Sequence, residues 1–305
     1  MISKRLFHRM LAQKYLYLMV VPCMIWFIVF NYIPMAGIII AFKKYTFAKG
    51  IFGSPWAGLQ YFEQFVTGYH FKIILINTLA ISFLKLIFAF PAPIALALLL
   101  NEVKLKLFKR SVQTLSYMPH FISWVIVIGI WGRMLSVDEG IVNTVLIKLG
   151  IADEPINFML TSQYMWSIAT LSEIWKTVGF SSIIYLAALS AINTELYEAA
   201  GIDGAGRFRK LFHITLPGIR PTIAILFILA IGGIFSSNFD QLYIMGLPPV
   251  LDKTEVIDTY IYRYGLQHLQ YNIGAAAGLL RSFVALILVL LTNKIVKMLG
   301  EDGLY

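Results

Sequence analysis

Six long apolar stretches restrict this chain more than any other feature of its sequence. A helix that crosses a lipid bilayer needs about 20 mostly apolar residues. Backbone polar groups in lipid must be hydrogen-bonded within the protein, and a helix satisfies them within its own segment. The sequence therefore predicts an all-α polytopic membrane protein with six spans, near residues 15–42, 72–100, 111–134, 163–190, 219–244 and 274–299.

The composition supports this class and excludes others. Of the 305 residues, 59% are hydrophobic and 13% are charged, whereas soluble domains carry about 25% charged residues. The single cysteine, Cys23, lies in an apolar run, which excludes a disulfide framework and a thiolate metal site. The 15–42 stretch is much longer than the signal-peptide core of about 7–15 residues, so we expect it to be retained as a span.

The positions of Lys and Arg predict the orientation. Cytoplasmic loops of membrane proteins carry an excess of basic residues, and here these residues gather in four segments. This pattern places residues 1–14, the tail 300–305 and the two intervening basic loops in the cytoplasm, with the spanning domain over 15–299. The net charge of +9 then follows from topology and does not indicate nucleic-acid binding. The basic residues concerned are Lys4, Arg5, Arg9, Lys14, Lys104, Lys106, Lys109, Arg110, Arg207, Arg209, Lys210, Arg220, Lys294 and Lys297.

The cytoplasmic segment 193–217 contains an unusual run of small residues. We expect two short helices, the first capped by Asn193 or Thr194 and the second capped by Asp203, with Pro217 ending the second. A glycine inside a helix costs about 1 kcal/mol relative to alanine, so the run favours a surface that another backbone approaches closely. The alternative is an amphipathic helix that rests on lipid headgroups. The small residues are Ala199, Ala200, Gly201, Gly204, Ala205 and Gly206, and Glu198 adds one charge.

Bulky residues near this surface have a separate expected role. Leu196, Phe208, Leu211 and Phe212 are predicted to pack against the membrane-embedded body. They would then hold the small-residue surface in place beneath the spans.

The stretch EAAGIDGAGRFRKLFHITLPGIRPT is similar to the EAA loop of bacterial ABC-importer permeases, whose pattern is E-A-A, then Gly, then I-x-L-P. Residues 118–135, 173–200 and 256–266 resemble the MalF/MalG-type sugar permeases, the binding-protein-dependent transport system inner membrane components. Within that family the chain looks closest to the LplB-like branch for oligosaccharides derived from polysaccharides. The matching loop positions are Glu198, Ala199, Ala200, Gly201, Gly206, Ile214, Leu216 and Pro217.

The resemblance implies a partner assembly in a bacterial cell membrane. In the family, the EAA helix is a coupling helix that docks on a cytoplasmic ABC ATPase subunit, and Glu198 stands at the motif glutamate. The expected partners are a second homologous permease, two ATPase subunits, an extracytoplasmic solute-binding protein and the oligosaccharide. ATP–Mg would bind to the ATPase, and no cofactor to this chain. The predicted coupling residues are Glu198, Ala199, Ala200, Gly201, Asp203, Gly204, Gly206, Leu216 and Pro217.

Motifs that would make the chain an enzyme or an ATPase are missing. The sequence has no G-x-x-x-x-G-K-[ST], H-E-x-x-H or G-x-S-x-G. Energy must therefore come from another subunit or from an ion gradient. The alternative to an ABC permease is an ion-gradient-driven secondary sugar transporter, with Glu173 or Asp240 as the coupling carboxylate. A membrane enzyme acting on lipid-linked sugars would need a catalytic cluster that the sequence does not show.

Ionisable residues within the spans are candidates for function, because burying a charge in lipid is costly. Glu173 and Lys176 are one helical turn apart, so they either pair with each other or line the substrate path. Arg281 lies near the middle of its span and is expected to face a cavity. Lys85 is expected to find a carbonyl or a neighbouring carboxylate.

The predicted sugar path combines polar groups with aromatic rings. Its first candidates are Asn238, Asp240 and Tyr243, with Trp175 and Trp124 as stacking surfaces. For each aromatic residue the alternative is packing between helices or a place in the interfacial belt.

Three helix irregularities are also expected within the spans. Pro91 and Pro93 are predicted to interrupt the second span, and Gly232 and Gly233 the fifth. His120 after Pro119 is predicted to mark an irregularity in the third.

Overall fold

The computed structural model describes residues 12–236, 238–301 and 303–304. The predicted cytoplasmic segment 1–14 lies largely outside these residues, as do two positions of the tail 300–305. Within the described residues the chain is helical and forms no named strand, only an isolated bridge between Lys43 and Trp56. The predicted all-α class is thereby confirmed.

Four continuous helices are long and apolar enough to cross a membrane: Lys14–Phe42, Phe71–Glu102, Arg207–Gly232 and Tyr271–Met298. Two further pairs of helices meet this criterion only together, because each pair is bent. These are Lys106–Phe121 with Trp124–Met134, bent by 108°, and Ser162–Ser190 with Thr194–Ile202, bent by 67°. The described chain therefore holds four candidate spans, or up to six if each bent pair is one span.

The chain divides into two compact units, of which the smaller contains residues up to Thr67 and Arg263–Leu279. Its first helical run consists of α2 (Lys14–Phe27), a π-helical turn (Ile28–Tyr32), α3 (Ile33–Met35) and a 3-10 segment (Ala36–Phe42). The short helices α4 (Gly50–Gly53) and α5 (Gln60–Thr67) follow. Phe42 stacks on Trp56, with ring centroids 5.7 Å apart, and packs against Phe62.

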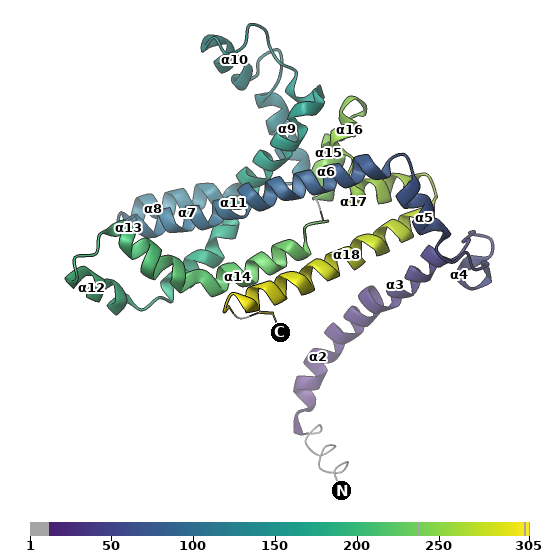
Figure 1. The fold of residues 1–305 in the computed structure, drawn as a ribbon, viewed down its shortest axis with the longest axis horizontal. Coiled ribbons are helices and arrows are strands. Elements are labelled where there is room, and N and C mark those ends of the chain that lie inside the picture. The colour runs from purple at the N-terminus through teal and green to yellow at the C-terminus, as the bar shows by residue number, and fades with distance from the viewer. Residues whose placement is uncertain (1–11, 237, 302, 305) are drawn as a thin grey trace. The chain divides into compact units, whose positions relative to one another are not determined.

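The larger unit contains Gly68–Tyr262 and the chain from Leu280 onward. Its longest uninterrupted helix, α11, packs along α6, α7, α8 and α14 (Figure 1). The helices are α6 (Phe71–Leu84), α7 (Pro91–Glu102), α8 (Lys106–Tyr117), α9 (Trp124–Met134), α10 (Ile141–Lys148), α11 (Met165–Ser190), α12 (Thr194–Ile202), α13 (Arg207–Lys210), α14 (Leu216–Gly232), α15 (Phe239–Met245), α16 (Leu251–Thr254), α17 (Ile257–Tyr260) and most of α18 (Tyr271–Met298).

The prolines of the second span do not interrupt it, contrary to the sequence prediction. The helical run Phe71–Glu102 is continuous. A π-helical turn over Lys85–Ala89 comes directly before Pro91, which starts α7. The wider turn changes the backbone hydrogen-bonding register ahead of the prolines. Their missing N–H groups therefore fall in the first turn of a helix, where no intrahelical partner is lost.

The third apolar stretch, predicted as one span over 111–134, is broken instead. After α8, residues Met118–Phe121 tighten into a 3-10 turn, and Ile122 and Ser123 are extended before α9 begins. The predicted irregularity at Pro119 and His120 is confirmed. The 108° bend at this break was not predicted.

The fifth span begins and ends earlier than the predicted 219–244. It runs from Arg207 through a π-helical turn (Leu211–Thr215) into α14 and ends at Gly232. Pro217 therefore does not end a helix but lies in the first turn of α14. The interruption predicted at Gly232 and Gly233 is confirmed, and the polar residues after it begin a separate helix, α15.

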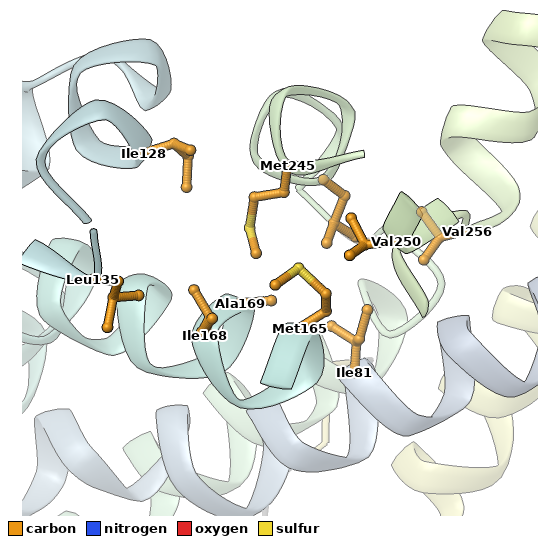
Figure 2. Close-up of a cluster of buried hydrophobic side chains, with 10 residues drawn as sticks. Ile81, Ile128, Leu135, Met165, Ile168, Ala169, Met245, Val250 and Val256 are labelled. Carbon is orange, nitrogen blue, oxygen red and sulfur yellow. The ribbon is translucent and has the colours of Figure 1, made fainter. Parts of the chain in front are cut away.

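One hydrophobic cluster joins α6, α9, α11 and α15 (Figure 2). Ile81, Ile128, Met165 and Met245 point into it from these four helices. Hydrogen bonds fix the adjoining loop, since the Asn77 amide donates to the carbonyls of Asp252 and Glu255 at 2.9 and 3.0 Å. This packing positions α15, which carries part of the predicted sugar path.

Candidate functional site

The small-residue surface lies on α12, which turns 67° away from α11. The Asn193 side-chain oxygen accepts a hydrogen bond from the Glu195 backbone N–H at 3.0 Å, which confirms the predicted cap. Glu198, Ala199 and Gly201 are exposed, and Ala200 is half-buried. A Cβ at Gly201 would meet only the flexible end of the Lys210 side chain, at 3.1 Å. The face of α12 is therefore open to a close-fitting partner.

Side-chain bonds tie α12 to the helix that follows it. The Lys210 ammonium donates to the Tyr197 carbonyl at 2.9 Å, and the Tyr197 hydroxyl lies 3.0 Å from the hydroxyl of Thr215. Gly204 allows the tight connection, because its φ of +73° is in the left-handed region that favours glycine. These bonds connect α12 to Thr215, at the start of α14.

Two expectations for this segment are corrected. Asp203 ends α12 and does not cap α13, whose N-cap is Gly206. Phe208 is 79% exposed and Leu196 is 54% exposed, so they do not pack on the membrane-embedded body, and Phe212 is exposed as well. The bonds through Tyr197 and Lys210 hold α12 in place instead. Gly204 and Gly206 are exposed, Leu216 is half-buried and Pro217 is exposed.

The charged residues within the spans form pairs that the sequence did not identify. Glu173 does not pair with Lys176; its carboxylate contacts the Lys85 ammonium at 3.3 Å and accepts a hydrogen bond from the Asn238 amide. The Lys85 and Glu173 side chains are only 17% and 16% exposed. The expectation that Lys85 meets a carboxylate is confirmed.

Gln241 completes this polar network, and the sequence analysis missed it. Its side chain is fully buried, accepts from Lys85 at 3.2 Å and donates to the Ala169 carbonyl and the Ser172 hydroxyl at 2.7 and 2.8 Å. A buried amide in an apolar helix is a recognisable signal, but its partners lie far away in the sequence. The network connects the second span, α11 and the broken end of the fifth span.

A cavity of about 220 Å³ opens beside this network. Lys85, Glu173, Ser82, Thr177 and Ser236 supply its polar lining. The Ser82 hydroxyl donates to the Ile234 carbonyl, one of the backbone groups at the break that follows α14. The cavity therefore combines polar groups with an apolar lining that includes Leu86, Phe90 and Ile234, a combination that can bind a ligand with both apolar and hydroxyl groups.

Arg281 forms an ion pair with Asp258 of α17. The sequence analysis had predicted that it faces a cavity. The pair neutralises both charges, so Arg281 links α18 to the turn that contains α17.

The remaining predicted path residues are not gathered around the cavity. Asp240 and Trp175 are exposed. Tyr243 stacks on Phe239 with ring centroids 5.3 Å apart, and Tyr262 lies edge-on to it at 5.1 Å. Trp124 packs against the hydrophobic cluster and faces the Lys176 ammonium. Among all the predicted path residues, contacts join Asn238 to Glu173 and Lys176 to Trp124.

An all-helical chain with membrane-length helices, buried ion pairs and a tethered small-residue helix has the architecture of a transport permease. The chain belongs to the family described as "Binding-protein-dependent transport system inner membrane component", whose model matches residues 89–300.

Two Bacillus subtilis (strain 168) proteins are similar over nearly the whole chain. The polygalacturonan/rhamnogalacturonan transport system permease protein YteP is 45% identical over 302 residues, which are 99% of this chain and 94% of that protein. Protein LplB is 42% identical over 293 residues, which are 96% of this chain and 92% of that protein.

A solved structure shows the same fold. It is the crystal structure of a bacterial alginate ABC transporter in complex with an alginate pentasaccharide-bound periplasmic protein. One of its chains matches with a TM-score of 0.90 and 40% identity, covering 98% of this chain and 100% of that chain. The family assignment from the sequence is confirmed.

Proposed function

We propose that this chain is the transmembrane permease subunit of an ATP-driven importer for oligosaccharides derived from polysaccharides, and that it forms half of the translocation pathway. α12 is its coupling helix and receives the motion of a cytoplasmic ATPase subunit. The chain itself supplies no ATPase activity, and ATP–Mg binds to the ATPase subunits.

One observation carries the coupling role: α12 exposes small residues, and it is tethered through Tyr197 and Lys210 to the helix that follows it. Its exposed Ala199 and Gly201 permit a close approach, while Tyr197 connects it to Thr215. A helix resting on lipid would instead need a bulky apolar face. An exposed surface joined to the start of a span supports a rigid lever, through which movement of a docked subunit becomes movement of the span.

The cargo class is inferred from the relatives. One of them is described as a polygalacturonan/rhamnogalacturonan permease, and a solved neighbour imports alginate. We infer that this chain also passes fragments of a polysaccharide. The cavity beside Lys85 and Glu173 lies within the helices that would line such a path.

The complete transporter needs further subunits. A second homologous permease forms the other half of the pathway, two ABC ATPase subunits dock on the coupling helices, and an extracytoplasmic solute-binding protein delivers the cargo. Both termini and α12 face the cytoplasm, in agreement with the excess of basic residues near α8, α13 and the start of α14.

Reconstitution in liposomes tests the energy source. The purified complex should import the oligosaccharide only when ATP is present on the ATPase side. Import driven by a proton or sodium gradient without ATP would instead establish the secondary transporter. In this structure Glu173, one candidate coupling carboxylate for that alternative, is already bound by Lys85 and Asn238.

Substitution of Gly201 tests the docking surface. Gly201→Trp should leave the spans folded, because the new Cβ would meet only the far end of the flexible Lys210 side chain, which can move at the expense of its bond to the Tyr197 carbonyl. The ATPase subunits should no longer co-purify. Glu195→Trp, at an exposed position in the first turn of α12, is a control for bulk added outside the small-residue run. Unchanged co-purification of Gly201→Trp would show that the docking assignment is wrong.

A further inference from the structure

The break in the third span leaves backbone carbonyls without helical partners. α8 ends at Tyr117, and Ile122 and Ser123 are extended, so the α-helical hydrogen bonds do not continue across residues 118–123. The Pro119 carbonyl accepts one 3-10 type bond, from the Ile122 N–H at 3.2 Å. The last carbonyls of a helix always lack intrahelical donors. At membrane depth water does not replace these donors, so the protein must provide others.

Lys176 of α11 provides them. Its ammonium donates to the carbonyls of Pro119, His120 and Ile122 at 3.3, 2.7 and 2.5 Å. A lysine ammonium has three N–H donors, and three carbonyls from the break accept them. The residue is only 8% exposed, so these carbonyls are its main polar environment.

Among the described residues, the hydrogen bonds of the Lys176 ammonium go to backbone carbonyls and not to a carboxylate. Within the part of the chain that the structure describes, no carboxylate forms an ion pair with Lys176, and nearby Glu173 is bound to Lys85 and Asn238. The C-terminal end of a helix carries partial negative charge on its free carbonyls. The Trp124 ring, at the first residue of α9, lies 5.5 Å from the ammonium and adds a cation–π contact.

The same face of α11 holds the break at two further points. Phe180, one turn after Lys176, stacks on the His120 ring with centroids 3.9 Å apart and an interplanar angle of 4°. Gly179 lies so close to α8 that a Cβ there would overlap the Ser116 carbonyl. Packing therefore fixes α8 against α11. Lys176 extends beyond the end of α8 and contacts residues 119–122, where the chain changes direction.

We propose that Lys176 is a positioning residue for transport. Its ammonium, bonded to the backbone carbonyls of the break, holds the bend of the third span and so fixes the direction of α9. α9 packs against α15, which carries Asp240 and Tyr243 of the predicted sugar path. Removing the ammonium leaves the His120 and Ile122 carbonyls unsatisfied within the membrane, whereas the Pro119 carbonyl keeps the Ile122 N–H. Unsatisfied carbonyls favour helical re-pairing. The bend should then open toward a straighter span.

A distance measurement tests the structural part of this proposal. Spin labels at Arg110→Cys and Met134→Cys, in a Cys23→Ser background, report the bend in the purified complex. We expect one short distance in the parent protein. In Lys176→Met the distribution should broaden and shift toward the roughly 36 Å that 24 residues of straight helix span. Lys294→Met, the same change at an exposed lysine, should leave the distance unchanged.

Chemical rescue tests whether donated hydrogen bonds, and not merely charge or volume, are needed. This part rests on the proposed transport function. Lys176→Ala should lower ATP-dependent import on the order of tenfold. Propylammonium, which replaces the missing part of the side chain, should restore import. Tetramethylammonium has the charge but no N–H donor and should not.

The outcomes separate the inference from the proposed function. Parental distances and parental import in Lys176→Met would overturn the inference. One further outcome is that Lys176→Met does not assemble into the complex. In that case, propylammonium added during purification of Lys176→Ala should recover the complex. Failure of this rescue would overturn the inference that Lys176 holds the bend. If the parental complex imports nothing, the proposed function fails, while the distance measurement still decides the role of Lys176.

Discussion

At the scale of single residues, four charged residues of the predicted spans each have a specific partner, and the nature of the partner differs among them. Lys85 and Glu173 neutralise each other, Arg281 pairs with Asp258, and Lys176 is held by carbonyls. A buried charge is tolerated when its partner is buried with it, whereas removal of one partner leaves the other charge buried and uncompensated. The polar groups of Lys85 and Glu173 in the cavity lining therefore carry no net charge between them.

The Lys85–Glu173 pair gives a prediction at this scale. Lys85→Met should lower the free energy of unfolding by about 3 kcal/mol, because it leaves the Glu173 charge uncompensated. The double variant Lys85→Met/Glu173→Gln should recover most of that loss, since a neutral amide tolerates burial. Thermal melting of the four members of this cycle in detergent measures the coupling. Additive losses in the double variant would show that the ion pair is not the stabilising element.

At the scale of elements, the helices depend on close approach at particular positions. Gly179 of α11 lies against the Ser116 backbone, whereas Gly129 of α9 has open space around it. A methyl group therefore fits at Gly129 and does not fit at Gly179, although both glycines lie in apolar helices. A comparison of substitutions at Gly179 and Gly129 therefore distinguishes a packing requirement from helix propensity.

Gly179→Ala should destabilise the protein by about 1–3 kcal/mol, because the new Cβ meets backbone that cannot move aside. Gly129→Ala is the matched control and should be neutral or stabilising by up to about 1 kcal/mol, from helix propensity alone. The shift in melting temperature of each variant measures the difference. Equal shifts would mean that α8 and α11 are not closely packed at Gly179.

The link between α12 and α14 gives a second prediction for elements. Tyr197→Phe removes the hydroxyl that contacts Thr215, at a cost of about 1 kcal/mol, and leaves the exposed face of α12 unchanged. The ATPase subunits should still co-purify, but less sugar should be imported per ATP hydrolysed. The ratio of import to hydrolysis in proteoliposomes measures this loss. An unchanged ratio would show that the Tyr197–Thr215 contact does not transmit motion.

At the scale of the whole molecule, the basic residues and the small-residue helix imply one orientation in the membrane. The segments near α8 and α13 are rich in Lys and Arg, whereas residues 137–162 carry Asp138, Glu139, Asp153 and Glu154. The excess of positive charge on cytoplasmic loops predicts that these two sets lie on opposite sides.

Cysteine accessibility tests this orientation. In a Cys23→Ser background, Asp153→Cys should react with a membrane-impermeant maleimide in intact spheroplasts. Asp203→Cys should react only after the membrane is opened. Both native residues are exposed, so burial does not confound the comparison. Labelling of Asp203→Cys from outside would reverse the topology and remove α12 from the reach of a cytoplasmic ATPase.

Features that depend on local properties could be predicted from the amino-acid sequence. The length of each apolar stretch predicted helices in lipid, and the helix Lys14–Phe42 covers the stretch predicted over 15–42. Short-range chemistry likewise predicted the Asn193 cap, the irregularity at Pro119 and the interruption after Gly232. Each of these follows from residues within one or two turns of each other.

Only the tertiary structure decided which polar groups meet. Glu173 has Lys176 one turn away, yet pairs with Lys85, which lies 88 residues earlier in the sequence. Gln241 and Asn238 join them from beyond the break in the fifth span. The spans are apolar on all sides, so their sequences do not indicate which face meets which neighbour. Partner choice in this protein therefore depends on helix packing, and the bend that Lys176 holds exists only because α11 lies beside it.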